Sequence, residues 1–565
     1  MKKPNRELDR LRRERSELEN HHIDELLAGR LDRREFIRRG SVIGLSMPVM
    51  GAILAACGSS SSSSASSSAS SSSSAAPAAK SGGTLRLASQ TPAAAINPLT
   101  VADSGGLCML QQTGEFLVLD NNMKTMLEPM LATSWKPNSD ASVWTFTLRS
   151  GVTFSDGSPM TADDVVYTFK QLADPKNASN ALSTFQGVLS PAGVQKVDAT
   201  TVAFHLETPV GAFPYLISSD NYNAIIVKQG TDFSKWQSTF LGTGPFKLSS
   251  YTQNVGASFV PNPHYWGPKP LLSSVQFKFY AGQQPQILAL QGGDVDVIVQ
   301  FVPAGASSLL HSSSYQIIKL VSANHRELSM RNDIAPFTDP RVRQAVAYSL
   351  NRPAMVSALL YGYGGVANDY PFFPRFPSTN TSVPQRAQNI AKAKALLAAA
   401  GHPHGISSPL YTEVYEEIPE LAQVIKAQAA EAGIDITLNI LPQSQYYGKA
   451  TYGNSDWLDG EISLVDYGDR GVPNVFLTAP LTSNGPWNAA RFHNRTYDSL
   501  VKQFLAAQDL QTQRQLAGKI EELLLAETPI VIPYWINGLT AAVPGVGGLN
   551  PTSISQIFLG QAYKS

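Results

Sequence analysis

The chain has 565 residues, of which 43% are hydrophobic, 9% aromatic and 16% charged. At about 100–200 residues per domain, this length predicts two or more domains. Basic and acidic residues each number 44, so no excess of positive charge indicates binding to nucleic acid. No apolar run reaches the roughly 18 residues that a membrane-spanning helix needs, which excludes a channel or a permease.

The first 56 residues have the features of a cleaved export signal. Arg33 and Arg34 precede an apolar stretch, 41–56, which two glycines and a proline interrupt. Such a stretch is too short to span a membrane stably and is typical of the hydrophobic region of a signal peptide. The paired arginines resemble a twin-arginine signal, although Asp32 stands where Ser or Thr is usual. General secretion therefore stays open as the alternative export route.

A lipid anchor is predicted directly after this signal. Leu54-Ala55-Ala56-Cys57 resembles a bacterial lipobox, in which the cysteine thiol is lipidated and becomes the new N-terminus. Residues 59–74 are 14 serines and two alanines, which cannot bury enough apolar surface to offset the entropy of ordering. We therefore expect a linker over 57–79 that holds the body at the extracytoplasmic face of the cell membrane.

The body reads as mixed α/β, and its clearest strand covers 143–148. Polar and apolar residues alternate there, which places Trp144, Phe146 and Leu148 on one face. A turn at Arg149-Ser150-Gly151 follows, and glycine there favours a reversal of the chain.

Three helices are predicted from their ends. Thr161 can cap a helix with Asp164 completing the capping pair, and Asp339 with Pro340 marks another helix start. A third helix is expected over about 387–400, where a glycine ends it.

Five blocks of sequence carry a resemblance to a known family. In chain order they are LATSW at 131–135 with WTFTLRSGVTFSDGSPMTADDVV at 144–166, GTGPFKL at 242–248, NPHYWG at 262–267, GDVDV at 293–297 and PFTDPRVRQA at 336–345. The chain resembles the family 5 extracellular solute-binding proteins, the peptide, dipeptide and nickel receptors of ATP-driven ABC importers. The resemblance covers nearly all of the chain from Gly82 onward.

This resemblance implies a two-lobed periplasmic-binding-protein fold that closes on its ligand by hinge motion. The implied first lobe is 80–320, with an extra subdomain at about 119–240. The second lobe is 321–530, and 531–565 returns to the first lobe. The implied partners are a peptide or another small solute and the permease and ATPase subunits of an importer.

The resemblance also suggests where a ligand binds. The segment VDYGDRGVPNVFL at 465–477 is similar to one in peptide receptors whose acid pairs with the α-ammonium group of the ligand. Asp466 is the matching residue, and a turn aspartate is the alternative. Tyr467, Trp487 and Asn488 are further candidates for the pocket. Either aromatic residue could instead belong to the core, and for Trp487 the core is the favoured interpretation.

The absence of known catalytic and metal-binding motifs from the sequence argues against an enzyme. The sequence has no HExxH or CxxC motif, no GxSxG elbow and no Walker loop, so no metal or cofactor is expected. The second cysteine, Cys108, is expected to pack as a small hydrophobe. The same fold with a metal chelate or an oligosaccharide as ligand, and a lipid-anchored surface enzyme, remain the alternatives to a peptide receptor.

Overall fold

The computed structural model describes residues 23, 26, 81–121 and 126–565. Contacts divide the chain into residues 1–76 and 77–565, and the second unit is the body described below. Arg33, Arg34 and Cys57 lie outside the described residues, as does the linker 57–79. Within the described ranges, no helix is long and apolar enough to cross a membrane.

A sheet of twelve strands runs through the body and confirms the α/β prediction. In spatial order its main path is β15 (Ile434–Leu441), β14 (Ile406–Glu413), β16 (Ile462–Tyr467), β12 (Gln316–Met330), β18 (Tyr534–Ala542), β11 (Val297–Phe301), β1 (Thr84–Gln90), β10 (Ser274–Tyr280), β9 (Gly256–Pro261) and β8 (Phe246–Thr252). Two shorter strands pair beside this path, β13 (Gly364–Val366) with β18 and β17 (Ile530–Val531) with β12.

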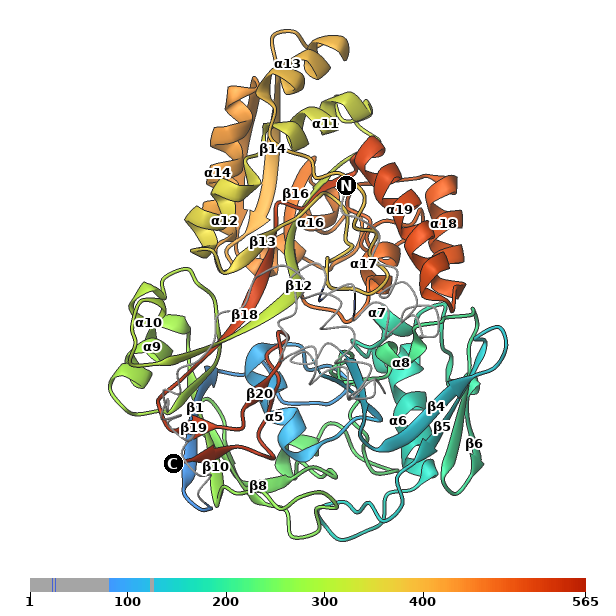
Figure 1. Ribbon diagram of the computed structural model, residues 1–565, viewed down its shortest axis with the longest axis vertical. Coiled ribbons are helices and arrows are strands. Elements are labelled where there is room, and N and C mark those ends of the chain that lie inside the picture. Colours follow the sequence, from blue (N-terminus) through green and yellow to red (C-terminus); the bar gives the residue numbers. More distant parts are fainter. Residues whose placement is uncertain (1–22, 24–25, 27–80, 122–125) are drawn as a thin grey trace, which may run out of the picture. The chain divides into compact units, whose positions relative to one another are not determined.

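The long strands β12 and β18 connect the two halves of this sheet (Figure 1). They pair antiparallel, and their register shifts between Leu320 and Asn324. Before the shift β18 also pairs with β11, and after it β12 also pairs with β16. Inside the irregular stretch, the Ser322 hydroxyl donates to the carbonyl of Ile536 at 2.6 Å. The two strands therefore form the crossings between the halves.

Buried side chains form separate cores on either side of this register shift. Two clusters draw mainly on residues 85–309 and on the chain after 538, and two others draw on 323–536. We call 81–320 with 538–565 the first lobe and 321–537 the second lobe. The predicted return at about 531 lies just before this second crossing. Val472 is an exception, because this second-lobe residue packs in a first-lobe core.

The region of the expected subdomain has a sheet of its own. Its four strands lie in the order β4 (Ala132–Pro137), β5 (Val143–Leu148), β7 (Thr201–His205) and β6 (Val194–Asp198). A hairpin of β2 (Val118–Asn121) and β3 (Met126–Pro129) precedes them. Trp144, Phe146 and Leu148 are the buried residues of β5, which confirms the predicted alternation.

Helices pack around both lobes. The first lobe has α5 (Ser104–Thr113), α6 (Ala162–Ala173), α7 (Leu182–Phe185), α8 (Phe213–Leu216), α9 (Gln283–Gln291) and α10 (Ser307–Leu310). The second has α11 (Pro340–Ser349), α12 (Arg352–Leu360), α13 (Ile390–Ala399), α14 (Ile418–Glu431), α15 (Gln443–Tyr447), α16 (Asp456–Asp459), α17 (Asn474–Thr478), α18 (Arg495–Ala506) and α19 (Leu510–Glu527). Near the C-terminus, β19 (Val546–Gly547) pairs with β22 (Tyr563–Lys564), and β20 (Asn550–Pro551) pairs with β21 (Ile557–Phe558).

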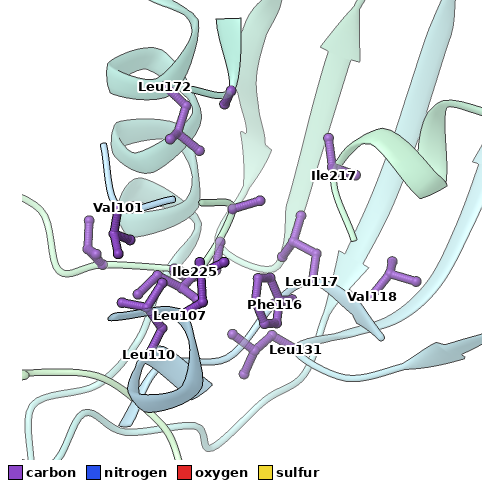
Figure 2. Packing of buried hydrophobic residues seen from close by; sticks show 14 of the residues in the cluster. Val101, Leu107, Leu110, Phe116, Leu117, Val118, Leu131, Leu172, Ile217 and Ile225 are labelled. Carbon is purple, nitrogen blue, oxygen red and sulfur yellow. The ribbon is translucent and has the colours of Figure 1, made fainter. Parts of the chain in front are cut away.

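Two predicted helix starts are confirmed, and the helix expected over about 387–400 is present as α13, which begins later, at Ile390. Thr161 and Asp164 form a capping box at the start of α6, and Asp339 caps α11 with a proline in its first turn. Figure 2 shows the first-lobe core, where Leu107 of α5 lies beside Ile225. Cys108 is buried in the same core, as predicted for a small hydrophobe, and burial raises the pKa of its thiol to about 12.

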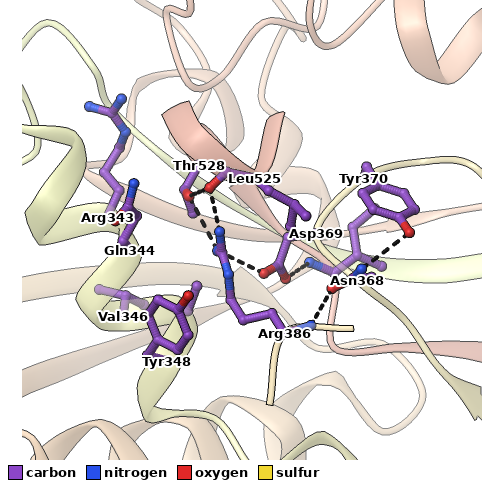
Figure 3. Close-up of polar contacts among 12 residues, drawn as sticks. Arg343, Gln344, Val346, Tyr348, Asn368, Asp369, Tyr370, Arg386, Leu525 and Thr528 are labelled. Carbon is purple, nitrogen blue, oxygen red and sulfur yellow. Dashed lines mark hydrogen bonds and ion pairs between the residues drawn. The ribbon is translucent and has the colours of Figure 1, made fainter. Parts of the chain in front are cut away.

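A fully buried ionic group links distant segments of the second lobe, and Figure 3 shows the Asp369 and Arg386 part of it. The Asp369 carboxylate accepts from Arg352 Nη2 at 2.7 and 2.8 Å and from Arg386 Nη1 at 3.0 Å. The backbone N–H of Ile532 donates to it at 3.1 Å, and Arg386 also donates to the Thr528 hydroxyl. Segments far apart in the sequence therefore meet at one carboxylate.

Asp369→Asn should destabilise the second lobe by about 3–5 kcal/mol, because it leaves two guanidinium groups buried without their counter-charge. Urea unfolding followed by circular dichroism measures this change. Asp435→Asn is the matched control, since Asp435 is exposed on β15. A loss below about 1 kcal/mol for Asp369→Asn would contradict the structural role of the group.

Candidate functional site

Carboxyl groups gather where the parallel strands β14 and β16 end. Glu413 is the last residue of β14, and Asp466 is the penultimate residue of β16. Glu416 and Glu417 follow β14 in the short connection to α14. The carboxyl ends of neighbouring parallel strands share one edge of a sheet, where ligands of α/β proteins commonly bind.

Arg326 neutralises part of this charge from the neighbouring strand β12. It is the cross-strand partner of Asp466, and its guanidinium is buried. Its Nε and Nη2 donate to Glu417 at 2.9 Å each, and Nη2 donates to Glu416 at 2.6 Å. Burial by itself would lower the pKa of Arg326, but Glu417 and Glu416 outweigh it and raise that pKa well above its usual value. The hydroxyl of Tyr534 also donates to Glu417 at 3.0 Å.

Asp466 and Glu413 share a single tyrosine hydroxyl. Tyr447 Oη lies 3.1 Å from Asp466 Oδ1 and 2.8 Å from Glu413 Oε1, and its one proton can serve only one carboxylate at a time. Gln443 Nε2 donates to the other oxygen of Glu413 at 2.6 Å. Burial, and next the charge of Asp466, raises the pKa of Glu413 to about 7. At mildly acidic pH the pair of carboxyl groups, Glu413 and Asp466, therefore holds a proton. A bound cation would displace that proton.

Two of the four carboxyl groups bond to the Arg326 guanidinium and the other two share the Tyr447 hydroxyl, so carboxyl groups outnumber cationic groups among these contacts. Burial raises the pKa of Glu416 to about 6 despite the opposing effect of Arg326. Carboxyl groups held together away from water favour a bound cation, which would relieve their mutual repulsion.

The acidic group borders a cavity between the lobes. Tyr415 and Glu416 form its second-lobe side. The first-lobe side carries amide and hydroxyl groups, including those of Gln90, Ser104 and Gln300. Ser104 Oγ donates to Gln90 Oε1 at 2.8 Å. One wall therefore offers negative charge, and the other offers neutral hydrogen-bonding groups.

The family model for bacterial extracellular solute-binding proteins, family 5, matches residues 126–487. The chain belongs to this family. The murein peptide-binding protein MppA of Escherichia coli is 28% identical over 451 residues, which cover 74% of this chain and 82% of MppA. Heme-binding protein A of Haemophilus influenzae is 26% identical, with 78% and 84% of the two chains covered. These relatives are binding proteins, and the chain is likewise a solute-binding receptor of the kind that serves ABC importers and is not an enzyme.

Solved structures agree on the fold. The substrate-binding protein CtaP of Listeria monocytogenes has a TM-score of 0.75 at 24% identity, covering 86% of this chain and 100% of CtaP. The protein DppA of Helicobacter pylori, solved with the peptide STSA, has a TM-score of 0.71 at 22% identity, covering 86% of this chain and 98% of DppA.

The predicted site residues of this solute-binding protein occupy different surroundings. Asp466 is half-buried in the acidic group. Tyr467 is buried and packs against His325 and Phe476, with ring centroids 5.4 and 6.1 Å away. Trp487 is half-buried, and its ring centroid lies 6.1 Å from that of Tyr467.

Asn488 stabilises its own loop through hydrogen bonds. Its Nδ2 donates to the carbonyls of Thr482 and Phe492 at 3.1 and 2.9 Å, and its Oδ1 accepts from the backbone N–H of Phe492. These bonds satisfy both ends of the amide within the loop. The structure therefore brings Tyr467 and Trp487 together and places Asp466 with a different set of partners.

Most members of the acidic group were not predicted from the sequence. Glu413, Tyr415, Glu416 and Glu417 form a dense acidic and aromatic run after a strand, which is a usable signal for a site. Arg326 carried no comparable signal, because its role depends on the pairing of β12 with β16.

Glu413→Gln should make the unliganded protein more stable than wild type at pH 8.5 by about 1–3 kcal/mol. The folded pKa of Glu413 is raised, so its stabilising effect is fully present at low pH and is lost as pH rises through about 7. Glutamine stays neutral, so the two proteins should have equal stability near pH 5. Urea unfolding at both pH values tests this. A stability difference that does not change with pH would contradict the shared-proton interpretation.

Proposed function

We propose that this receptor captures peptides between its lobes by their α-ammonium group and passes them to the permease and ATPase subunits of an importer. The observation that carries the proposal is the excess of carboxyl groups around Asp466 beside the interlobe cavity. The peptide-binding relatives MppA and DppA support it.

The physical reason is the cost of burying an ammonium group. A cleft that closes over its ligand removes water, so the ammonium needs a fixed negative partner. An α-ammonium group is common to peptides with a free N-terminus, and one carboxylate can therefore serve ligands of varied sequence. A neutral oligosaccharide or an anionic chelate would gain nothing from the negative charge around Asp466 and Glu413.

Asp466→Asn should weaken binding of tri-alanine by about 30-fold to several thousand-fold, because it removes the charge while keeping the shape. Isothermal titration calorimetry measures the affinity. N-acetylated tri-alanine should bind wild type and Asp466→Asn with similar affinities, since it lacks the ammonium group. Asp435→Asn should bind like wild type. A loss below threefold with tri-alanine would show that Asp466 has no ammonium partner.

We further propose that Cys57 is lipidated and that 57–79 tethers the receptor to the extracytoplasmic face of the membrane. The motif Leu54-Ala55-Ala56-Cys57 and the serine-rich segment support this anchor. Export through the twin-arginine route, directed by Arg33 and Arg34, is the accompanying proposal.

Cys57→Ala should move the protein from the membrane fraction to the soluble fraction, because it removes the thiol to which the lipid is attached. Fractionation followed by immunoblotting measures the distribution. Cys108→Ala is the control and should stay with the membrane, since Cys108 is buried in the core. Full membrane retention of Cys57→Ala would rule out the anchor.

A further inference from the structure

A second cavity lies where the second-lobe loop 468–472 meets the first lobe. The residues around it include Asp120 and Tyr215 of the first lobe and Phe373, Arg375, Asp469 and Arg470 of the second. Val472, next in the loop, packs in a first-lobe core. This cavity is therefore built from both lobes.

Two of the carboxylates in this region have compensating partners. Asp469 accepts from the backbone N–H of Ala323 at 2.6 Å and from the Ser553 hydroxyl. Burial raises the pKa of Asp220 to about 7, against the opposing charge of Arg470 and the N–H of Gly471. Asp469 therefore belongs to the internal bonding of the interface, and Arg470 offsets part of the charge of Asp220.

Asp120 differs from these two acids. It is only 5% exposed, and in the part of the chain that the structure describes it bonds through its backbone to Ser219 while its carboxylate has no hydrogen bond or ion pair. Burial, and next the charges of Asp220 and Asp469, raises its pKa well above the usual range. A buried carboxylate without a partner is costly, and a ligand cation would supply the missing partner.

The position of Asp120 is fixed by its surroundings. Its backbone N–H donates to Ser219 Oγ at 2.9 Å. A Cβ atom added at Gly471 would lie 2.4 Å from Asp120 Oδ2, so the absence of a side chain at Gly471 gives the carboxylate its space. The acid is therefore held in place at the cavity wall.

We propose that this second cavity takes the ammonium or guanidinium group of a basic side chain of the bound peptide, with the Asp120 carboxylate as its charged partner. The proposal rests on the peptide-binding function and adds a preference for lysine or arginine. Tyr215, with a half-buried ring, and Phe373, with a buried ring, both line the cavity. Aromatic rings can pack against the apolar stem of such a side chain and attract its charged end.

Titration calorimetry of the full-length protein with matched tripeptides tests this subsite. Lysine is placed at each position of tri-alanine in turn and compared with norleucine, which keeps the stem and lacks the charge. We expect wild type to prefer lysine by at least about tenfold at one position, consistent with a charged partner. Asp120→Asn should reduce that preference to below threefold and leave the norleucine peptides within threefold. Asp435→Asn is the charge-matched control.

A peptide with Nε-acetyl-lysine at the preferred position gives an independent measurement on wild type alone. It should bind like the norleucine peptide, and this comparison decides the case even if Asp120→Asn does not fold. The proposed subsite would be overturned if wild type shows no preference for lysine. It would also be overturned if the preference persists in Asp120→Asn, or if the Nε-acetyl-lysine peptide binds as tightly as the lysine peptide. Neither result would contradict peptide binding itself. If no tripeptide binds wild type, the peptide function and the subsite both fail.

Discussion

The pairing of β12 with β18 is the constraint on which the rest of the structure depends. These two strands carry the sheet from one lobe to the other, and the shift in their register falls between the two sets of cores. The pairing places β16 beside β12 on the second-lobe side and β11 beside β18 on the first-lobe side. Because of this order, the loops that follow β14 and β16 lie next to first-lobe residues.

Comparison of the buried charges separates structural groups from candidate binding groups. Asp369 has two guanidinium partners and a backbone N–H, so its charge is fully compensated inside the lobe. Glu413 and Asp466 share one hydroxyl, and the Asp120 carboxylate, unlike its backbone, has no hydrogen bond or ion pair among the described residues. Groups that burial perturbs and that the fold leaves uncompensated are the ones expected to act on a ligand.

Local features of the fold could be predicted from sequence because their causes are local. The alternation in β5, the capping box at Thr161 and the proline at the start of α11 each depend on neighbouring residues. The candidate site depends on contacts between distant segments. Arg326 meets Glu417 across 91 positions of the chain, and Ala323 meets Asp469 across 146. The hydrophobic periodicity of a sequence does not indicate which distant segments will pair. Asp466 was predicted only from the resemblance to a family.

The two cavities suggest how charge can couple binding to closure of the lobes. Each has walls from both lobes, and each has acidic groups at or beside its wall. Closing such a cleft without a ligand removes water from carboxyl groups that already repel one another, whereas closing it over a cation offsets part of that cost. A ligand shifts a conformational equilibrium only by its differential affinity for the two states. In the proposed receptor, a peptide with an α-ammonium group would supply that difference at Asp466, and a basic side chain would add to it at Asp120.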